Sequence, residues 1–350
     1  MVAWYCLLVI MLVIGLRWRQ DGAQSSVLSV ESASVLNGAS ILFVFVQHIH
    51  AFLLGPLNYE YKGLLDKCYI PLSDMICQQH VVMFLFFSGY GVMEQLLKRG
   101  DAYLDGFGKK RIFRVWANFA IAVAVYAVWN LVLRTDVSFR QMLVSLTCWQ
   151  QIGNPSWYIF CILCCYAAFG VSALAFRRIK LPYRGLWLPV AFLCVVYVLV
   201  LHHFIPQKTW WYNTVAAFVF GVFFSSYRDR ILLLLKRYYW AFLPAVCIAF
   251  YVAYTRFVSF KDFGIKNNLL SVCFIMVVLT FTMKVKIVSP VLSWCGKHVF
   301  PLYMYHGLFF LIVRSLYSGS LTPLVAHALI AAVLVMTLLT AKYYHYWEVR

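Results

Sequence analysis

The chain has 350 residues, of which 63% are hydrophobic and only 12% are charged. An ordinary soluble domain is nearer half apolar and a quarter charged, so the composition excludes that class and predicts a membrane protein. A net charge of +18 would suggest nucleic-acid binding in a soluble protein. Here the cations stand in short loops between apolar runs, where they fix topology and face anionic lipid head groups, and nucleic acid is not an expected partner.

Apolar runs bounded by charge, Gly or Pro predict an all-α polytopic protein with about eleven transmembrane helices. The first run, 1–16, is short and is followed by Arg17 and Arg19. A cleaved signal peptide is the alternative, but the run lacks a basic stretch before its apolar core and an A-x-A-like cleavage site, which favours a short helix or anchor. The other expected spans are 35–54, 80–97, 115–133, 156–176, 186–205, 210–226, 239–255, 268–283, 299–315 and 322–341.

The loop charges predict the orientation of the chain. If the loop at 17–34 is cytoplasmic and the spans alternate, 21 of the 30 Lys and Arg lie on the cytoplasmic side. We therefore expect the chain to start outside the cytoplasm and to end inside it. Residues 1–34 are expected to form a short transmembrane helix with a cytoplasmic linker, and 35–350 one membrane-embedded domain, since no repeat, low-complexity tract or soluble domain is visible.

His48 is the first candidate for chemistry, because ionisable residues inside a bilayer are costly and mark functional sites. It follows Asn37 by 11 residues, about 16 Å of helix rise, or about halfway through a hydrocarbon core of about 30 Å. A neutral imidazole there can deprotonate a hydroxyl. The structural alternative is a histidine that bonds a neighbouring helix through Gln47 or Ser88. His50 faces another way and is expected to be an interfacial or packing residue.

The second candidate is the segment FFSGYG at 86–91 together with the basic loop that follows it. Ser88 and Gly89 let backbones approach closely, which suits helix packing as well as passage of a ligand chain. Arg111 and Arg114 lie one helical turn apart, where two guanidinium groups can grip one phosphate. Topology alone would also explain these cations. The loop cations are Lys98, Arg99, Lys109, Lys110, Arg111 and Arg114.

Two later segments place polar side chains in or beside spans. Trp157 opens a span after Pro155 with an indole donor, a position that an interfacial aromatic belt explains equally well. Tyr303 and His306 are three residues apart on one helical face, so a hydroxyl and an imidazole can converge there. Hydrogen bonding within the core is the alternative for this pair.

The remaining cysteines and histidines predict no metal site. Cys161-x-x-Cys164 lies within a span without a second pair, so packing is favoured over redox or zinc chemistry. His202–His203 has no acidic or Cys partner nearby and is expected at an interface. Cys68 and Cys77 share one polar loop and can form a disulfide if that loop faces an oxidising compartment.

These segments, in this order, resemble membrane-bound acyltransferase family 3, the multi-spanning O-acyltransferases that modify bacterial surface glycans. The family's first motif is an Arg-Gly-x-Ala-like start followed eleven residues later by His, a position that His48 matches with Gly38 after the start. The resemblance covers roughly residues 35–341, a ten-helix core that the run 1–16 precedes. The other matching positions are Phe86 to Tyr90, Arg111, Arg114, Trp157, Tyr158, Phe218 to Asp229, Gly296, Lys297, Tyr303 and His306.

The resemblance implies a bacterial inner-membrane enzyme that takes an acyl group, most often acetyl, from cytoplasmic acyl-CoA. The expected acceptor is a hydroxyl of an extracytoplasmic or lipid-linked carbohydrate. His48 would act as general base, or be acylated itself, and an oxyanion would be stabilised by Trp157, Tyr303 or amides near Gly89. The residues expected to act in catalysis are His48, Tyr303, His306 and Trp157, and those expected to hold the donor are Arg111, Arg114, Lys110, Ser88 and Gly89.

Asn37 stands where the family has its leading Arg, which bears on donor affinity or on activity itself. Arg17, Arg19 or Lys110 are the candidates to replace that charge.

Two other classes of protein fit the same composition. A transporter or flippase can use a buried His in proton coupling, although internal repeats and matching interrupted helices are not visible. A non-catalytic relative that binds a lipid or scaffolds partners is the other.

Overall fold

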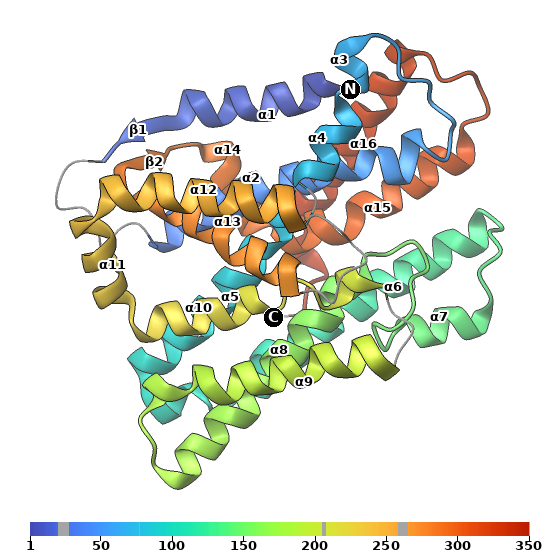
Figure 1. Cartoon of the computed structure of the whole chain (residues 1–350). Coiled ribbons are helices and arrows are strands. Elements are labelled where there is room, and N and C mark those ends of the chain that lie inside the picture. The colour runs from blue at the N-terminus through green and yellow to red at the C-terminus, as the bar shows by residue number, and fades with distance from the viewer. Residues whose placement is uncertain (20–27, 77, 205–207, 258–264, 350) are drawn as a thin grey trace.

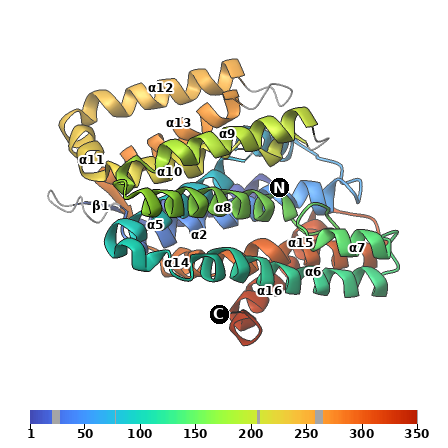
Figure 2. The ribbon, with the colours of Figure 1, turned by 90° about the horizontal axis from the view of Figure 1, so that it is seen from below.

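The computed structural model describes residues 1–19, 28–76, 78–204, 208–257 and 265–349, most of them in helices (Figure 1). Within these residues, eight helices are long and apolar enough to cross a membrane. The long helices run side by side, with α12 and α13 at one edge of the bundle and α16 at the opposite edge (Figure 2). The expected class, an all-α polytopic membrane protein, is confirmed.

Each apolar run forms a helix because hydrocarbon offers no partner to backbone N–H and C=O groups, which must bond within the segment. Ser29, Ser289 and Thr322 cap α2, α14 and α16 by accepting a backbone N–H. The helices that match the expected runs are α1 (Val2–Gly15), α2 (Val30–Ile49), α5 (Gln79–Arg99), α6 (Arg114–Val132), α8 (Ser156–Ile179), α9 (Trp187–Phe204), α10 (Ala216–Ser226), α12 (Tyr239–Phe257), α13 (Ile265–Lys284), α15 (Val299–Leu316) and α16 (Pro323–Tyr343). The shorter elements are α3 (Leu64–Lys67), α4 (Tyr69–Ile76), α7 (Phe139–Ser145), α11 (Arg228–Arg237), α14 (Pro290–Lys297), β1 (Leu16–Trp18), β2 (Val285–Ile287), the π-helical turns His50–Leu54 and Gly108–Phe113, and four 3₁₀ turns, Gly100–Tyr103, Tyr183–Gly185, Thr209–Trp211 and Tyr344–Tyr346.

The expected count of about eleven spans is not confirmed, because three of the helices do not qualify as spans by themselves. With 14 and 11 residues, α1 and α10 rise only about 21 Å and 16 Å, less than a hydrocarbon core of about 30 Å. The helix α12 meets α11 at an angle of 101° and passes as a span only together with it.

The two ends of the bundle differ in charge. The turns at 100–113 and 180–186, the helix α11 and the strands β1 and β2 gather at one end, on the left of Figure 1, which we call the basic end. The helices α3, α4 and α7 and the segment 208–215 lie at the other, which we call the cavity end. The helix α5 therefore runs from the cavity end to the basic end, and α2 and α15 run the opposite way.

A small antiparallel sheet holds the N-terminal segment against the basic end. Leu16 pairs with Ile287 and Trp18 with Val285. Beyond β1, the Arg19 Nε donates to the backbone oxygen of Thr282 at 2.7 Å. Residues 16–19 are therefore bound to the end of α13.

Two pairs of helices touch backbone to backbone at glycines. A Cβ at Gly89 of α5 would lie 2.1 Å from the Phe218 oxygen of α10, and a Cβ at Gly221 of α10 would lie 2.2 Å from the Phe86 oxygen. The segment FFSGYG and the Phe-x-x-Gly segment at 218–221 thus pack directly on each other. Small residues permit such close approach in membrane helices.

The helices α2 and α14 make the same kind of contact. A Cβ at Gly38 would lie 1.8 Å from the Leu292 oxygen, and one at Gly296 would lie 1.7 Å from the Ser34 oxygen. The glycines of the first and last matched motifs therefore fix the position of α2, which carries His48.

Replacement of Gly89 by Ala should destabilise the protein, because the added methyl group forces α5 and α10 apart. We expect a cost of about 1–3 kcal/mol, seen as a lower melting temperature of the purified protein. Gly91→Ala on the same helix is the matched control, since a Cβ there meets nothing within 4 Å. Equal melting of the two variants would contradict the contact.

Candidate active site

The two histidines expected to act in catalysis lie in direct contact. The Nδ1 of His48 on α2 is 2.7 Å from the Nε2 of His306 on α15, although 258 residues separate them in the chain. His306 is 1% exposed, and the rings of Phe45, Phe52 and Phe310 pack around the pair. The hydrogen bond therefore lies in an apolar surrounding in the middle part of α15.

The hydrogen bonds of His306 define the proton positions of the neutral pair. Its Nδ1 lies 3.0 Å from the backbone oxygen of Leu302. A carbonyl oxygen only accepts, so Nδ1 of His306 carries the proton and Nε2 is an acceptor. His48 must then donate from its own Nδ1, which leaves the lone pair of its Nε2 free. The pair thus presents His48 as a base in one fixed tautomer.

The backbone next to His48 is unusual. A π-helical turn, His50–Leu54, follows α2 directly, and a second one, Gly108–Phe113, contains Arg111. Such turns are rare and are frequently found at functional sites. Two of the segments that were expected to carry chemistry therefore contain or adjoin a departure from regular helix.

A cavity of about 530 Å³ opens beside His48 at the cavity end of the bundle. Trp157 and Asn154 line it, as do the polar side chains of Asp74 and Gln151. Asn154 is 2% exposed, its Oδ1 accepts from the Ile152 amide at 2.9 Å, and its Nδ2 has no partner among the described residues. The other lining residues are Gln47, His50, Ala51, Phe52, Ile70, Ser73, Gln78, Val81, Gly153, Pro155 and Trp210.

Tyr303 lies three residues before His306 on α15. It is 3% exposed, its ring centroid is 6.1 Å from that of His306, and its hydroxyl has no hydrogen-bond partner within the described part of the chain. The ring of Tyr158 on α8 lies 5.3 Å away. The rings of Tyr303 and His306 are thus neighbours, as expected, but no hydrogen bond joins these two residues.

A line of polar side chains continues from Tyr158 toward the basic end. The Ser88 hydroxyl neighbours the hydroxyls of Tyr158 and Tyr166. The Arg111 guanidinium neighbours Tyr166 in turn, and its Nε donates to the Tyr103 hydroxyl at 3.2 Å. Arg111 is half-buried. The line crosses a bundle interior that is otherwise built of apolar side chains.

The other residues expected to hold the donor are placed differently. Arg114 and Lys110 are exposed, so Arg111 turns inward while Arg114 does not share its site. Gly89 is occupied by the contact with Phe218 described above, which makes it a packing residue in this structure. Only Ser88 and Arg111 of that set lie on the polar line.

Asn37 and the cations near it occupy the basic end. The Oδ1 of Asn37 is buried and has no partner among the residues described. Arg19 lies near the start of the same helix, where its Nη2 donates to the Ser32 Oγ at 3.2 Å. Arg17 instead donates to backbone oxygens of its own segment. Of these two cations, Arg19 is therefore the one that bonds to the helix that carries Asn37.

Further polar residues at the cavity end, with His50 of the cavity lining among them, form an outer polar layer. His50 Nδ1 lies 2.9 Å from the Tyr61 hydroxyl, and the Tyr59 hydroxyl donates to Asp66 at 3.0 Å. Burial raises the pKa of Tyr59 to about 12, so its phenol keeps the proton that it donates. His202 Nδ1 lies 3.0 Å from the Tyr212 hydroxyl. The expected bond between Cys68 and Cys77 lies outside the described residues.

Sequence reasoning missed most of the cavity lining. Asp74, Gln78 and Gln151 stand in polar stretches of the sequence, where such residues are common, and Trp210 resembles any interfacial tryptophan. Tyr166 and Tyr103 likewise stand in no sequence pattern that marks them as functional residues. A helical count from Tyr158 could have found Tyr166, since eight residues place both on one face of α8.

A membrane-spanning helical bundle that holds a bonded histidine pair between a polar cavity and a line of hydroxyl groups has the features of a membrane enzyme. The family model described as an acyltransferase domain matches residues 32–343. The chain therefore belongs to acyltransferase family 3 and is a multi-pass membrane acyltransferase, and the resemblance seen in the sequence is confirmed. No curated protein and no solved structure gave a significant match to the chain.

Proposed function

We propose that the protein moves an acyl group, most often acetyl, from cytoplasmic acyl-CoA to a hydroxyl of an extracytoplasmic carbohydrate. The observation that carries this proposal is the hydrogen bond between His48 and His306 at 2.7 Å. It provides a base in a fixed tautomer beside a cavity large enough for a sugar, since ligand pockets measure roughly 300–1,000 Å³.

The donor reaches the pair from the basic end. By the positive-inside rule this end faces the cytoplasm, in the bacterial inner membrane. Arg111 binds a phosphate of acyl-CoA, because a guanidinium group is a strong phosphate ligand. The pantetheine arm then follows the polar line past Ser88 and Tyr158 and brings the thioester to His48.

The transfer step needs no group beyond donor, acceptor and protein. The Nε2 of His48 takes the proton of the acceptor hydroxyl. At the same time the hydroxyl oxygen attacks the thioester carbonyl carbon. The tetrahedral intermediate carries a negative oxygen. The Tyr303 hydroxyl, which has no partner among the described residues, or the Trp157 indole stabilises this charge. Collapse breaks the C–S bond, the thiolate takes the proton from His48, and an ester and free CoA leave.

Arg111→Ala should raise the KM for acyl-CoA by roughly tenfold or more, since a hydrogen bond to a charged group is worth about 1.5–3 kcal/mol. The value of kcat should change much less, because Arg111 lies in the π-helical turn at the basic end, at the other end of the polar line from the histidine pair. CoA release at varied acetyl-CoA concentrations measures both constants. Arg178→Ala, an exposed cation at the same end, is the control, and equal KM values for the two variants would count against the donor site.

Labelled acetyl-CoA incubated with membranes tests the function as a whole. We expect label in an alkali-labile ester of a carbohydrate, and only where His48 is intact. Movement of a substrate across the membrane without ester formation would instead indicate a transporter. Absence of both from membranes that contain the wild-type protein would indicate a non-catalytic relative.

A further inference from the structure

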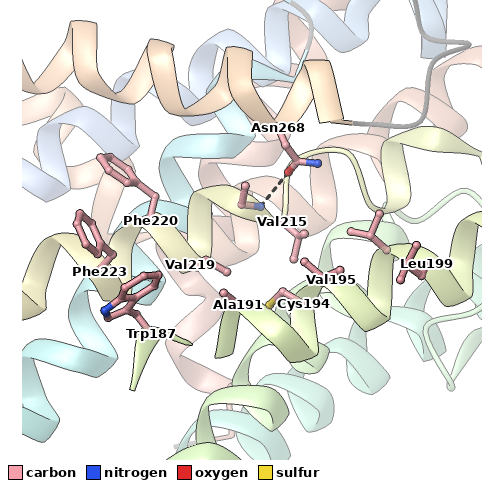
Figure 3. A pocket seen from close by; sticks show the side chains of 12 residues that line it. Trp187, Ala191, Cys194, Val195, Leu199, Val215, Val219, Phe220, Phe223 and Asn268 are labelled. Atoms are coloured by element: carbon pink, nitrogen blue, oxygen red, sulfur yellow. Dashed lines mark hydrogen bonds between the residues drawn. The ribbon is translucent and has the colours of Figure 1, made fainter. Parts of the chain in front are cut away.

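A second hollow in the molecule shares no described lining residue with the cavity beside His48. It is a groove of about 650 Å³ between α9 and α10, with Asn268 of α13 at one border (Figure 3). Trp187 and Phe223 lie at the basic end of the groove and Leu199 toward the cavity end. From Trp187 to Leu199 the groove follows α9 for about 18 Å at 1.5 Å per residue.

The lining of the groove suits a hydrocarbon chain. Asn268 carries the one amide in the described lining, and its Oδ1 accepts from the Ala216 amide at 2.9 Å, as the dashed line in Figure 3 shows. Apolar hollows stay free of water, because a water molecule there lacks hydrogen-bond partners. On α9, Val195 is 55% and Leu199 38% exposed, and α9 belongs to a segment long enough to cross the membrane. The groove therefore opens toward lipid and takes up an acyl tail.

The protein alone packs weakly around α9. Only three of the 18 residues of this helix are buried, Val190, Cys194 and Leu201. A side chain beside an empty hollow loses the dispersion contacts that neighbouring atoms would provide. An acyl tail in the groove restores these contacts and joins α9 to α10 and α13.

The basic end of the groove offers a donor for the polar part of a lipid. The Nε1 of Trp187 is buried and has no hydrogen-bond partner among the described residues. The ring of Phe223 packs edge-on against the indole, with the ring centroids 5.2 Å apart, and holds it in place. An indole N–H only donates, and buried donors are normally paired. The ester carbonyl of a phospholipid, which joins the head group to the tail, is an acceptor at the level where tryptophans lie in membranes.

Cations stand beside this end of the groove. Arg184 lies in the 3₁₀ turn that leads into α9, and its side chain is exposed. The segment 177–184 holds four Lys or Arg and no acidic residue. Two carboxylates, those of Asp101 and Asp105, pair with Arg177 of this segment. The remaining positive charge favours an anionic head group at this position.

We propose that the groove between α9 and α10 binds one anionic phospholipid from the leaflet at the basic end. One acyl tail lies in the groove, the Trp187 indole donates to the ester carbonyl, and Arg184 attracts the head group. Lipid tails elsewhere around the protein are as apolar as the groove, so these two polar contacts select the lipid. The bound lipid completes the packing of α9, and its binding does not require acyl transfer.

The lipid that the purified protein retains tests the choice of head group. Protein in detergent receives equal amounts of anionic phosphatidylglycerol and zwitterionic phosphatidylcholine, and native mass spectrometry reports which lipid stays bound. We expect the wild type to keep one phosphatidylglycerol in preference. Arg184→Gln should lower this preference roughly fivefold, the effect expected of one cation beside an anionic head group. Lys342→Gln is the control, because this exposed cation lies on α16, away from α9 (Figure 2).

Filling the groove tests the place of the tail. Ala191→Phe and Val219→Phe each add a ring to the groove from a different helix, and both should retain roughly tenfold less of either lipid. Val171→Phe adds the same ring on α8, at a position that is 62% exposed and lies outside the groove, and it should bind lipid as the wild type does. Trp187→Phe keeps the aromatic packing and removes the N–H, so it should bind phosphatidylglycerol more weakly.

Melting temperatures separate loss of binding from loss of fold. Added phosphatidylglycerol should raise the melting temperature of the wild type and of Val171→Phe, but not that of the two groove variants. If a ring lowers the melting temperature in detergent without lipid, Arg184→Gln and Trp187→Phe decide the question, since they leave the groove unfilled.

Three results would overturn the proposal. They are a wild type that retains no lipid, a wild type that retains both lipids equally, and groove variants that retain as much as Val171→Phe. A wild-type dimer that the groove variants convert to a monomer would instead assign the groove to a second copy of the chain.

Discussion

Replacement of His48 by Ala should lower kcat by about 10²–10⁴-fold, the usual contribution of a general base. The substitution removes the only imidazole nitrogen of the pair that is left free for the cavity, since both nitrogens of His306 are engaged. Release of CoA from acetyl-CoA, followed with a thiol reagent on the purified protein in lipid discs, measures the loss. The KM for acyl-CoA should change little, because the phosphates bind at the other end of the polar line.

His50→Ala is the matched control for this variant. His50 lines the same cavity but is engaged with the Tyr61 hydroxyl at 2.9 Å. Its loss should leave kcat within a few-fold of the wild type, and its melting temperature reports on the outer polar layer. A His48→Ala protein as active as His50→Ala would show that the base lies elsewhere.

Replacement of His306 by Ala should lower kcat by about 10²-fold, the lower end of the range expected for the loss of His48. His306 positions its partner, so its absence frees His48 to rotate and to adopt the other tautomer, a loss comparable in kind to that of the carboxylate in a serine protease triad. It also leaves the Nδ1–H of His48 without its acceptor in an apolar surrounding. The rate of CoA release again measures the effect.

His306→Gln separates positioning from simple structural support. Its Oε1 can take the place of the imidazole Nε2 and accept from His48, so this variant should recover part of the activity that Ala loses. The double variant His48→Ala/His306→Ala should be no slower than His48→Ala alone, because the pair acts as a unit. Additive losses, or no recovery with Gln, would show that His306 acts independently of His48.

The class of the fold was readable from the sequence because a bilayer imposes it. Apolar runs of sufficient length must become helices, and each expected run contains one. The number of spans was harder to predict from the sequence, since it depends on where each helix begins, ends and bends within the bundle. The run at 210–226 loses its first residues to the turn around Trp211, and that at 239–255 joins α11 at 101°.

The histidines of the site were also predictable, and their contact was not. His48 and His306 stood out as ionisable residues within apolar runs, but the sequence offered no way to pair residues that lie 258 positions apart. The spacing of Arg111 and Arg114 was misleading for a different reason. It assumes a regular α-helix, whereas Gly108–Phe113 is π-helical and turns only Arg111 inward.

The cavity and the groove came from the structure alone. Both are enclosed by segments from several helices, and their residues are ordinary for the places where they stand in the chain. Val195 and Leu199 are typical of any lipid-facing helix, and Asp74 and Gln151 of any polar loop. Only the packing of the helices brings them together.

Sealed membrane vesicles of both orientations offer the most direct test of transfer through His48. Labelled acetyl-CoA is supplied from outside, either to inverted vesicles, whose cytoplasmic face is outward, or to right-side-out vesicles. We expect alkali-labile label on luminal carbohydrate in inverted vesicles that contain the wild-type protein, and neither in right-side-out vesicles nor in inverted vesicles with His48→Ala. Equal label in the wild type and His48→Ala, or label from the right-side-out orientation, would contradict the account.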